Sequence, residues 1–486
     1  MSPTTSFATG YLDHDGLGLA ELVRRREVSA EELLAAALAQ ADAINPRINC
    51  IAHRHDEAAR AQIAAGLPDG PFRGVPFLLK DLGVELAGTI TSSGSRAFRD
   101  GPVATADSEL VARYKRAGLV IFGKTTSPEL GLTYTTESKA FGLTRNPFDP
   151  ERTCGGSSGG AAAAVASGIV PMAHASDGGG SIRVPASCTG LFGLKPSRGR
   201  MPAGPALTER WFGLATAHAL TRSVRDSAAL LDATAGPEPG ARYGAPPPPS
   251  GRFLHEIERP VAPLRIGLLE RPPSEAPVHP DCLAAVREAA RLCESLGHAV
   301  EPVSLALDAG ALNQGLLAIV QTTVAQTLRD HGAIRGKPVS AEELETITWM
   351  HAEQGSKLAA VALADANDAF QSAAITVAQL QSRHEVLLSP TLAEPPIALG
   401  LLSLSPADMA AFRREMACFS PFTALANMTG QPSMSVPLAW SAGGLPIGVM
   451  FTARYGEEAT LLRLARQLEE ARPWGTRRPG STCARP

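Results

Sequence analysis

The spacing of apolar residues near the start of the chain predicts a helix. Ser29 and Glu32 have the spacing of a capping box, in which each side chain satisfies a backbone N–H group at the start of a helix. The apolar positions that follow recur at helical spacing: Leu33, Leu34, Ala37, Leu38 and Ala41. We expect the helix to stop at Asn45 and Pro46, because proline ends most helical patterns.

Short apolar runs and amphipathic segments then alternate along the chain. Residues 75–79 form a short apolar run that ends in Lys80 and Asp81. Further strands are predicted at 119–122, 265–269, 298–303, 386–388 and 447–451. Helices are predicted at 107–117, 161–166, 281–296 and 457–468. This alternation predicts an α/β fold.

Two long segments depart from the alternation. Residues 236–263 are rich in proline, with four consecutive prolines at 246–249, and predict a long surface loop. Residues 311–380 are helical in pattern. We expect them to form most of a helical cap that extends over about 305–380. The length of 486 residues would suggest about three domains, but large α/β enzymes often fold as one unit.

Composition limits which binding partners and which cellular compartment we expect for this protein. The net charge of −3 gives no electrostatic reason to expect nucleic acid or an anionic membrane as a partner. Seven cysteines without a C-x-x-C pair fit thiols in a reducing compartment better than a disulfide framework. The first sixteen residues lack the pattern of a secretory signal. We therefore expect a soluble, cytoplasmic protein, and a homodimer is left open.

Two glycine-serine clusters are the most unusual feature of the sequence. They lie at 154–160 and 176–183, joined by an alanine-rich segment. So many adjacent glycines imply unusual backbone angles or close approach of the backbone to a bound molecule. A flexible or tightly packed loop would explain each cluster alone, but the pair favours a functional site.

Two familiar chemistries fit these clusters poorly. A phosphate-binding loop needs Lys and Ser or Thr after the glycines, whereas Ala161 and Ala162 follow here. The G-x-S-x-G elbow of α/β-hydrolases is matched at 155–159 and again at 156–160. That elbow must follow a buried strand, and residues 146–153 contain two prolines and several charges. An α/β-hydrolase-type esterase therefore stays as an alternative.

A lysine base is the third chemistry. The chain has only seven lysines, and Lys80 ends an apolar run where desolvation would lower the pKa of its ammonium group. A neutral lysine can accept a proton, which arginine cannot do. A lysine at the end of a strand is more often a surface residue with its charged end in water. No lysine has a serine three positions before it, which excludes the S-x-x-K arrangement.

Several ordered motifs of this chain resemble the amidase signature family. They are GVPFLLKD (74–81), GGSSGG (155–160), DGGGSIRVPAS (177–187), GLKP (193–196), GQPSMS (430–435) and GLPIG (444–448). The resemblance covers nearly the whole chain. It implies a single domain over 1–486, with a central mixed sheet flanked by helices and a core at about 60–235. Residues 170–200 look most like the branch of nylon-oligomer hydrolases, aryl acylamidases and urethane-cleaving enzymes.

The resemblance assigns roles to three residues of a Ser-Ser-Lys triad. It makes Lys80 the base, Ser157 the bridging serine, held by a cis peptide bond in the family, and Ser181 the nucleophile. The roles agree with the chemistry, because a serine hydroxyl needs a neighbouring base before it can attack a carbonyl. A thiol nucleophile at Cys154 is conceivable, but a small buried packing residue is the simpler interpretation.

The resemblance also implies an oxyanion hole, a supporting set and a pocket. The N–H groups of Gly178, Gly179, Gly180 and Ser181 would stabilise the oxyanion. The residues expected to support the site are Ser158, Asp177 and Arg183, the last two either as a brace of the loop or as a plain structural ion pair. The residues expected to face the substrate are Gly131, Leu132, Thr133 and Tyr134. The family often has Thr where Ser176 stands and another residue where Gly178 stands, which leaves the donor geometry open.

The implied activity is hydrolysis of amide-type C–N bonds in small molecules. Linear amides, cyclic amides, anilides and carbamates are all candidate substrates, and neither a metal nor a cofactor is implied. A glutamine-hydrolysing amidotransferase subunit, which would need a partner chain, stays open as a second function. An inactive binding module would require the loss of a triad member, and all three are present.

Overall fold

The computed structural model describes residues 10–480. The first nine residues, which belong to the segment without a signal pattern, and Cys483 lie outside this range. The other six cysteines are free thiols. Within residues 10–480, no helix is long and apolar enough to cross a membrane.

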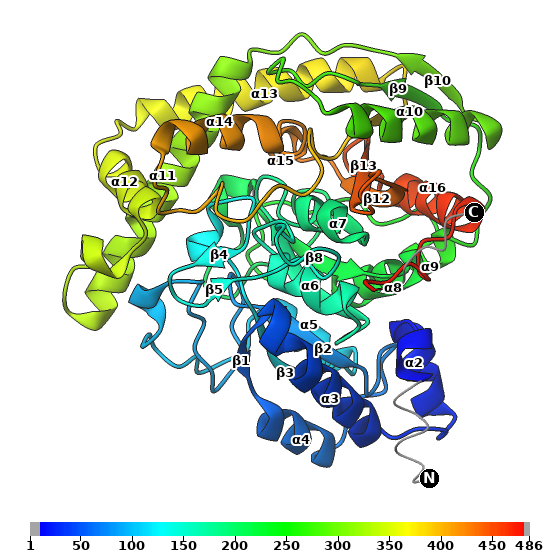
Figure 1. Ribbon diagram of the computed structural model, residues 1–486, viewed down its shortest axis with the longest axis vertical. Helices are drawn as coiled ribbons and strands as arrows, with labels where there is room; N and C mark the ends of the chain where they lie inside the picture. Colours follow the sequence, from blue (N-terminus) through cyan, green and yellow to red (C-terminus); the bar gives the residue numbers. More distant parts are fainter. Residues whose placement is uncertain (1–9, 481–486) are drawn as a thin grey trace.

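One mixed sheet of eleven strands runs through the protein (Figure 1). Its strand order is β1-β3-β2-β6-β8-β7-β12-β13-β11-β9-β10, and β4 and β5 form a separate pair. The strands are β1 (Ile51–Arg54), β2 (Pro76–Lys80), β3 (Val120–Thr125), β4 (Glu137–Ser138), β5 (Gly142–Leu143), β6 (Met172–Asp177), β7 (Phe192–Lys195), β8 (Thr216–Thr221), β9 (Arg265–Leu268), β10 (Ala299–Pro302), β11 (Val386–Pro390), β12 (Ser433–Trp440) and β13 (Pro446–Ala453).

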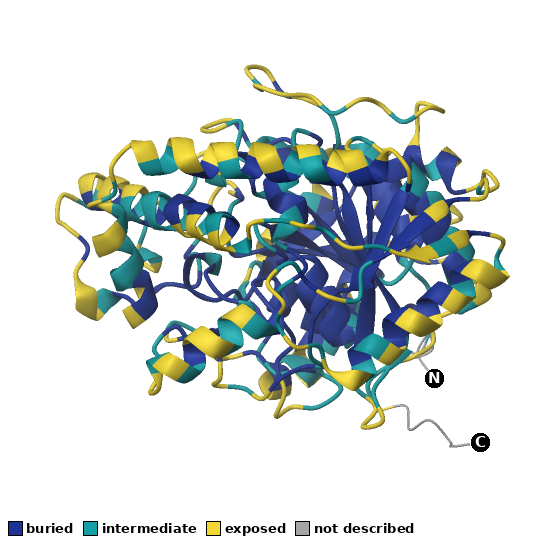
Figure 2. Cartoon of the chain, turned by 90° about the horizontal axis from the view of Figure 1, so that it is seen from above, coloured by how far each residue is buried: buried dark blue, intermediate teal, exposed yellow. Residues whose placement is uncertain are grey.

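Helices surround the sheet, as Figure 2 shows, with buried strands at the centre and the outer faces of the helices exposed. The longer helices are α2 (Gly16–Arg24), α3 (Ala30–Ile48), α4 (Asp56–Ala64), α5 (Glu109–Arg116), α6 (Gly159–Ala166), α7 (Arg183–Thr189), α8 (Val224–Thr234), α10 (Pro280–Ser295), α11 (Ala309–Arg335), α12 (Thr346–Gly355), α13 (Val361–Gln381), α14 (Met409–Phe419) and α16 (Glu458–Ala471). The short helices are α9 (Phe253–Glu256), α15 (Leu425–Thr429), η1 (Tyr11–Asp13), η2 (Arg96–Phe98), η3 (Glu129–Gly131), η4 (Trp211–Gly213) and η5 (Ala341–Glu343). This single-domain α/β arrangement is the predicted fold class.

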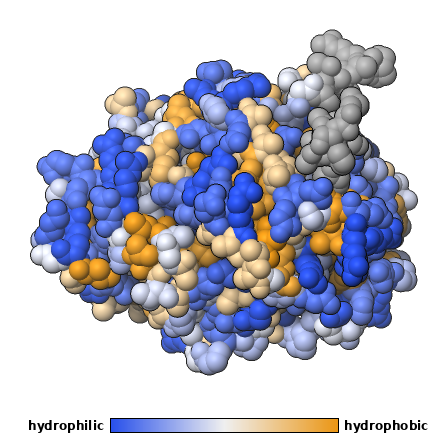
Figure 3. Space-filling model, turned by 90° about the horizontal axis from the view of Figure 1, so that it is seen from below, coloured by the Kyte–Doolittle hydropathy of each residue, from blue (hydrophilic) through white to orange (hydrophobic). Residues whose placement is uncertain are grey.

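Three helices of the predicted cap stand to one side of the sheet. In Figure 1, α11, α12 and α13 lie together, and α11 contacts both of the others. Val324 and Leu328 on α11 pack in one cluster with Leu130 and Leu132, which belong to the first half of the chain. The proline-rich segment is irregular apart from α9, whose Phe253 is buried. On the face seen in Figure 3, hydrophobic side chains are scattered among hydrophilic ones.

Some boundaries differ from the sequence prediction. The capping box of α3 is present, but the helix continues through Pro46 to Ile48. Proline lies in the last turn of this helix, where its missing N–H removes only one bond, and Asn49 then ends the helix in a left-handed conformation.

Five strands of the main sheet were not predicted from the sequence: β1, β6, β7, β8 and β12. β6 shows why the periodicity failed. His174, Ser176 and Asp177 make its sequence look like a loop, although the strand pairs with β2 on one side and β8 on the other. Polar side chains are retained there because they form the site described next.

Candidate functional site

The site lies where two parallel strands end. β2 and β6 are neighbours, with Leu78 opposite Ala173, so that Lys80 and Ser176 come together at one edge of the sheet. Carboxyl ends of adjacent parallel strands meet at the same edge, which is where α/β proteins place their ligands. The second glycine-serine cluster begins with the last two residues of β6, and the first runs into the start of α6, which packs on β6.

Lys80 is completely buried and contacts two serines. Its Nζ lies 2.7 Å from Oγ of Ser157 and 3.1 Å from Oγ of Ser176. Burial lowers the pKa of Lys80 to about 7, against a smaller opposite effect of Asp177. A neutral amine is therefore available near neutral pH, and its lone pair can accept the hydroxyl proton of Ser157. The alternative interpretation of Lys80 as a surface residue is therefore wrong.

The backbone around Ser157 is held in an unusual form. The peptide bond between Gly156 and Ser157 is cis. Gly131 has a φ of 73°, and a methyl group on it would come within 3.1 Å of Oγ of Ser157. Ser158 connects the two clusters, because its hydroxyl donates to the carbonyl of Ser176 at 3.2 Å and accepts the N–H of Ser176 at 3.3 Å.

Ser181 stands between β6 and α7 and borders the same cavity as Ser157 and Ser176. Within the described part of the chain, its hydroxyl has no hydrogen-bond partner. Lys80, Ser157 and Ser176 are thus brought into direct contact, while Ser181 faces the cavity beside them. Cys154 is fully buried, and burial raises the pKa of its thiol well above the usual value, which argues against a thiol nucleophile.

A buried ion pair shapes the loop before Ser181. Asp177 accepts hydrogen bonds from the N–H groups of Gly180 at 2.7 Å and Ile182 at 3.1 Å. It also accepts from Nη2 of Arg183 at 2.9 Å and from Nδ2 of Asn427 at 2.9 Å. Burial by itself would raise the pKa of Asp177, but these partners hold it well below the usual range. Asp177 therefore fixes the loop as well as pairing with a charge.

One of the four N–H groups predicted to serve as oxyanion donors is already used within the protein. The N–H of Gly180 is already engaged by Asp177, so it is not available to a substrate oxygen. Among residues 10–480, nothing accepts a hydrogen bond from the N–H groups of Gly178, Gly179 or Ser181. Three donors thus remain. A carboxylate that reaches back to a loop N–H cannot be foreseen from a run of glycines.

Gly180 should tolerate no side chain. Its φ is 140°, and a methyl group would lie 2.4 Å from Oγ1 of Thr423, which donates to the carbonyl of Gly179 at 2.6 Å. We expect Gly180→Ala to lower kcat/KM at least about 100-fold, because small displacements of catalytic groups cost that much. At Gly179 the nearest atom would be the Tyr134 hydroxyl at 3.7 Å. Gly179→Ala should therefore lose much less activity, and equal losses in amide hydrolysis assays would contradict the prediction.

The ion pair predicts a stability effect. Arg183 is completely buried, donating to Asp177, to the carbonyl of Thr423 at 2.7 Å and to Oδ1 of Asn427 at 2.7 Å. We expect Asp177→Ala to destabilise the fold by about 3–5 kcal/mol in urea unfolding, because it leaves a buried charge unpaired. The solvent-facing pair of Glu270 and Arg287 is the control, and Glu270→Ala should have little effect. Similar unfolding midpoints for the two variants would refute a structural role of the pair.

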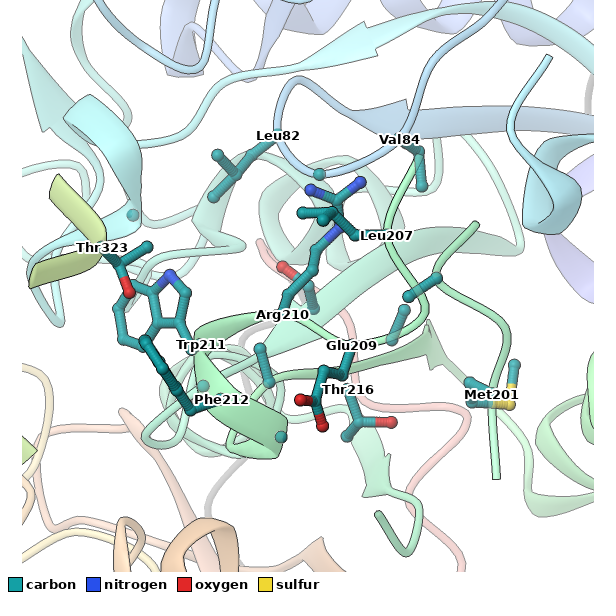
Figure 4. A pocket seen from close by; sticks show the side chains of 18 of the residues that line it. Leu82, Val84, Met201, Leu207, Glu209, Arg210, Trp211, Phe212, Thr216 and Thr323 are labelled. Carbon is teal, nitrogen blue, oxygen red and sulfur yellow. The ribbon is translucent and has the colours of Figure 1, made fainter. Parts of the chain in front are cut away.

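The cavity beside Ser181 has a volume of about 690 Å³ (Figure 4). Of the four residues expected to face the substrate, Gly131 and Leu132 line it. Thr133 does not, because it is buried and its hydroxyl donates to the carbonyl of Leu402 at 3.0 Å. Tyr134 is not on the wall either, and burial raises the pKa of its hydroxyl to about 12. After the turn at Gly131, therefore, only two of the four residues face the cavity.

The structure adds residues that sequence reasoning missed. His174 lines the cavity, and its Nδ1 accepts the N–H of Lys80 at 3.1 Å. Burial and the nearby Lys80 lower the pKa of His174 to about 3, so it is neutral. Thr423 and Asn427 hold the glycine loop from more than 240 positions away in the chain. Of these three residues, only His174 could have been noticed in the sequence, because it is a polar residue beside the second glycine-serine cluster.

Among residues 10–480, no three His, Cys, Asp or Glu side chains gather in a way that could hold a metal ion. The segment before Gly155 forms turns and isolated bridges, with no strand between residues 146 and 154. This arrangement differs from the strand that an α/β-hydrolase elbow requires.

The chain belongs to the amidase family, whose model matches residues 32–462. It is an amidase, a hydrolase that acts on amide-type C–N bonds. It is 38% identical over 476 residues to the 6-aminohexanoate-cyclic-dimer hydrolase of Paenarthrobacter ureafaciens, covering 96% of each chain. A solved structure of a 6-aminohexanoate cyclic dimer hydrolase superposes with a TM-score of 0.91 at 36% identity, over 96% of this chain and 99% of the other. A bacterial aryl acylamidase of the amidase signature family gives a TM-score of 0.85 at 26% identity, over 95% and 96%. The α/β-hydrolase alternative is thereby excluded.

Proposed function

We propose that this chain hydrolyses small-molecule amides through an acyl-enzyme on Ser181, with Lys80 as base and Ser157 as bridge. One observation carries the proposal: a fully buried lysine with a pKa of about 7 lies 2.7 Å from a serine hydroxyl. A lysine so placed is expensive to bury and is suited to general-base catalysis near neutral pH.

The proposed reaction begins with attack of Oγ of Ser181 on the amide carbonyl. The proton of Ser181 passes to Ser157, whose own proton passes to Nζ of Lys80. The N–H groups of Gly178, Gly179 and Ser181 stabilise the developing oxyanion, each donor contributing about 3 kcal/mol. The same relay returns a proton to the leaving nitrogen, which leaves as an amine. Water then attacks the acyl ester by the reverse route and releases the carboxylic acid.

The substrate class is proposed from the relatives. Cyclic amides and anilides are the first candidates, because relatives named for a cyclic dimer and for aryl acylamides share the fold over almost the whole chain. Linear amides and carbamates come next. A screen of the four substrate types with the purified chain tests the proposal and its main alternative together. Hydrolysis without any added partner chain would support a free amidase, whereas glutamine hydrolysis that needs a partner chain would favour an amidotransferase subunit.

A further inference from the structure

One arginine in the cavity beside Ser181 has no partner among the described residues. Arg210 lines this cavity, and its guanidinium makes no hydrogen bond or ion pair with any residue in 10–480. Arg198 also lines the cavity, but its guanidinium is hydrogen-bonded to backbone carbonyls of the protein. Its Nε donates to the carbonyl of Gly213 at 2.7 Å, and its Nη2 donates to the carbonyl of Asn427 at 2.8 Å. Arg210 is thus different from the neighbouring arginine.

The acidic side chains of the cavity wall do not neutralise Arg210. Glu209 pairs with Arg242 at 2.7 Å, and Asp330 pairs with Arg329 at 2.8 Å. Figure 4 shows the guanidinium of Arg210 pointing towards Leu82 and Leu207, while the carboxylate of Glu209 points the other way.

Two more acidic residues act on Arg210 only from a distance. Burial lowers the pKa of Arg210, and the charges of Glu85 and Glu238 oppose this effect. The carboxylate of Glu238 is occupied by the N–H groups of Ala203 and Gly204, each at 2.8 Å. Arginine stays protonated in proteins, so the cavity holds a cation with five N–H donors and no acceptor.

The backbone holds Arg210 firmly in this position. Its carbonyl accepts the N–H groups of Gly213 at 3.1 Å and Ala215 at 3.3 Å. The next two residues, Trp211 and Phe212, have φ values of 52° and 51°, which is a strained conformation for side chains of this size. Strained backbone of this kind is found where a site needs a fixed geometry.

The surroundings of the guanidinium favour one kind of ligand. Leu82, Val84 and Leu207 line the same part of the cavity, and apolar walls strengthen a charge-assisted hydrogen bond. A planar guanidinium matches a carboxylate with two parallel hydrogen bonds. An unpaired cation in such a place is unfavourable unless the ligand supplies the anion.

We propose that Arg210 binds a carboxylate of the substrate away from the bond that is cleaved, so that amides bearing a second, anionic end are the preferred class. This proposal rests on the amide hydrolysis proposed above, because it assumes that the acyl group on Ser181 extends into the same cavity. It makes Arg210 a specificity-determining residue of the reaction.

The test compares matched substrates that differ only at the far end. One series consists of ω-carboxyacyl 4-nitroanilides with two to four methylene groups. The other consists of the same 4-nitroanilides with the far carboxylate replaced by a neutral primary amide. For the wild type we expect kcat/KM to be about 10- to 100-fold higher for the best carboxylate than for its neutral partner, as two charge-assisted hydrogen bonds would provide. Release of 4-nitroaniline from the neutral series tests the hydrolysis itself, separately from the preference.

Three variants identify the residue responsible. Arg210→Gln should lower the carboxylate-to-neutral ratio to about one, and Arg210→Lys should keep part of it, because lysine supplies the charge without the paired donors. Arg287→Gln removes the same charge from an exposed pair with Glu270 and should change neither the ratio nor the activity. Labelling of Ser181 by a fluorophosphonate in each variant confirms that the site is still formed.

Several outcomes would overturn the proposal. If the wild type has the same kcat/KM for the neutral amides and for the carboxylates, the cation of Arg210 does not select the substrate. An unchanged ratio in Arg210→Gln, with Ser181 still labelled, would do the same. If Arg210→Gln cannot be labelled, Arg210→Lys decides in its place, because lysine lacks the paired donors. A carboxylate-to-neutral ratio that Arg210→Lys leaves at the wild-type value would contradict carboxylate binding by the guanidinium.

Discussion

Ser181→Ala is expected to lower kcat/KM for amides by about 10⁴-fold or more, because it removes the atom that forms the acyl-enzyme. The hydroxyl of Ser181 makes no hydrogen bond with any residue in 10–480, so its loss should leave the melting temperature close to that of the wild type. The measurement is hydrolysis of an anilide or cyclic amide, with thermal unfolding as the check on folding.

Ser158→Ala is the matched control for this variant. Ser158 lies next to Ser157 but bonds to the backbone of Ser176, so its loss should be much milder for activity. A fluorophosphonate or activated acyl probe should label Ser181 in the wild type, as seen by mass spectrometry of its peptides. Labelling of Ser157, Ser158 or Cys154 instead would overturn the assignment of the nucleophile.

The second large effect concerns Lys80. We expect kcat/KM to rise with pH through about 7 and then level off, because the protonated form that prevails at lower pH cannot accept a proton. Lys80→Arg keeps the charge but cannot deprotonate, so it should lose about 10²–10⁴-fold, as much as Lys80→Ala. Retention of more than about a tenth of the activity by Lys80→Arg would exclude the lysine base.

A second buried lysine makes a sharper control possible. Burial also lowers the pKa of Lys195 to about 7, but its Nζ donates to the carbonyl of Pro196 at 2.9 Å and does not line the cavity. In Lys195→Met the midpoint of the pH profile should therefore stay near that of the wild type. If kcat/KM no longer rises with pH in Lys195→Met but still rises in Lys80→Arg, the group that titrates is Lys195 and not Lys80.

The sequence predicted those parts of the protein that depend on local pattern. The capping box of Ser29 and Glu32 specifies the start of α3 by its own side chains, and the helix begins there. The strand at 76–80 was visible because a buried strand with both faces covered reads as a continuous apolar run. The family was evident from motifs in which glycine, serine and lysine occur in a fixed order. Local chemistry of this kind needs no knowledge of distant segments.

Local pattern failed wherever a strand carries functional side chains. β6 escaped prediction because its polar residues hide the period of a strand, and pairing with β2 brings them beside Lys80. Similarly, Thr133 was expected at the substrate but is turned away to Leu402, since the left-handed turn at Leu130 and Gly131 decides which side chains face the cavity.

The sequence by itself determined the α/β class, the family and the residue types from which a lysine-assisted serine hydrolase can be built. The tertiary structure alone decided which of the glycine N–H groups stay free, because Asp177 occupies that of Gly180. It alone decided that Asn427 and Thr423 hold the loop, and that the guanidinium of Arg210 has no hydrogen-bond or ion-pair partner in the part of the chain that the structure describes. The physical reason is the same in each case: these contacts join segments far apart in the chain, and their hydrogen bonds depend on how the strands pair rather than on the spacing of residues.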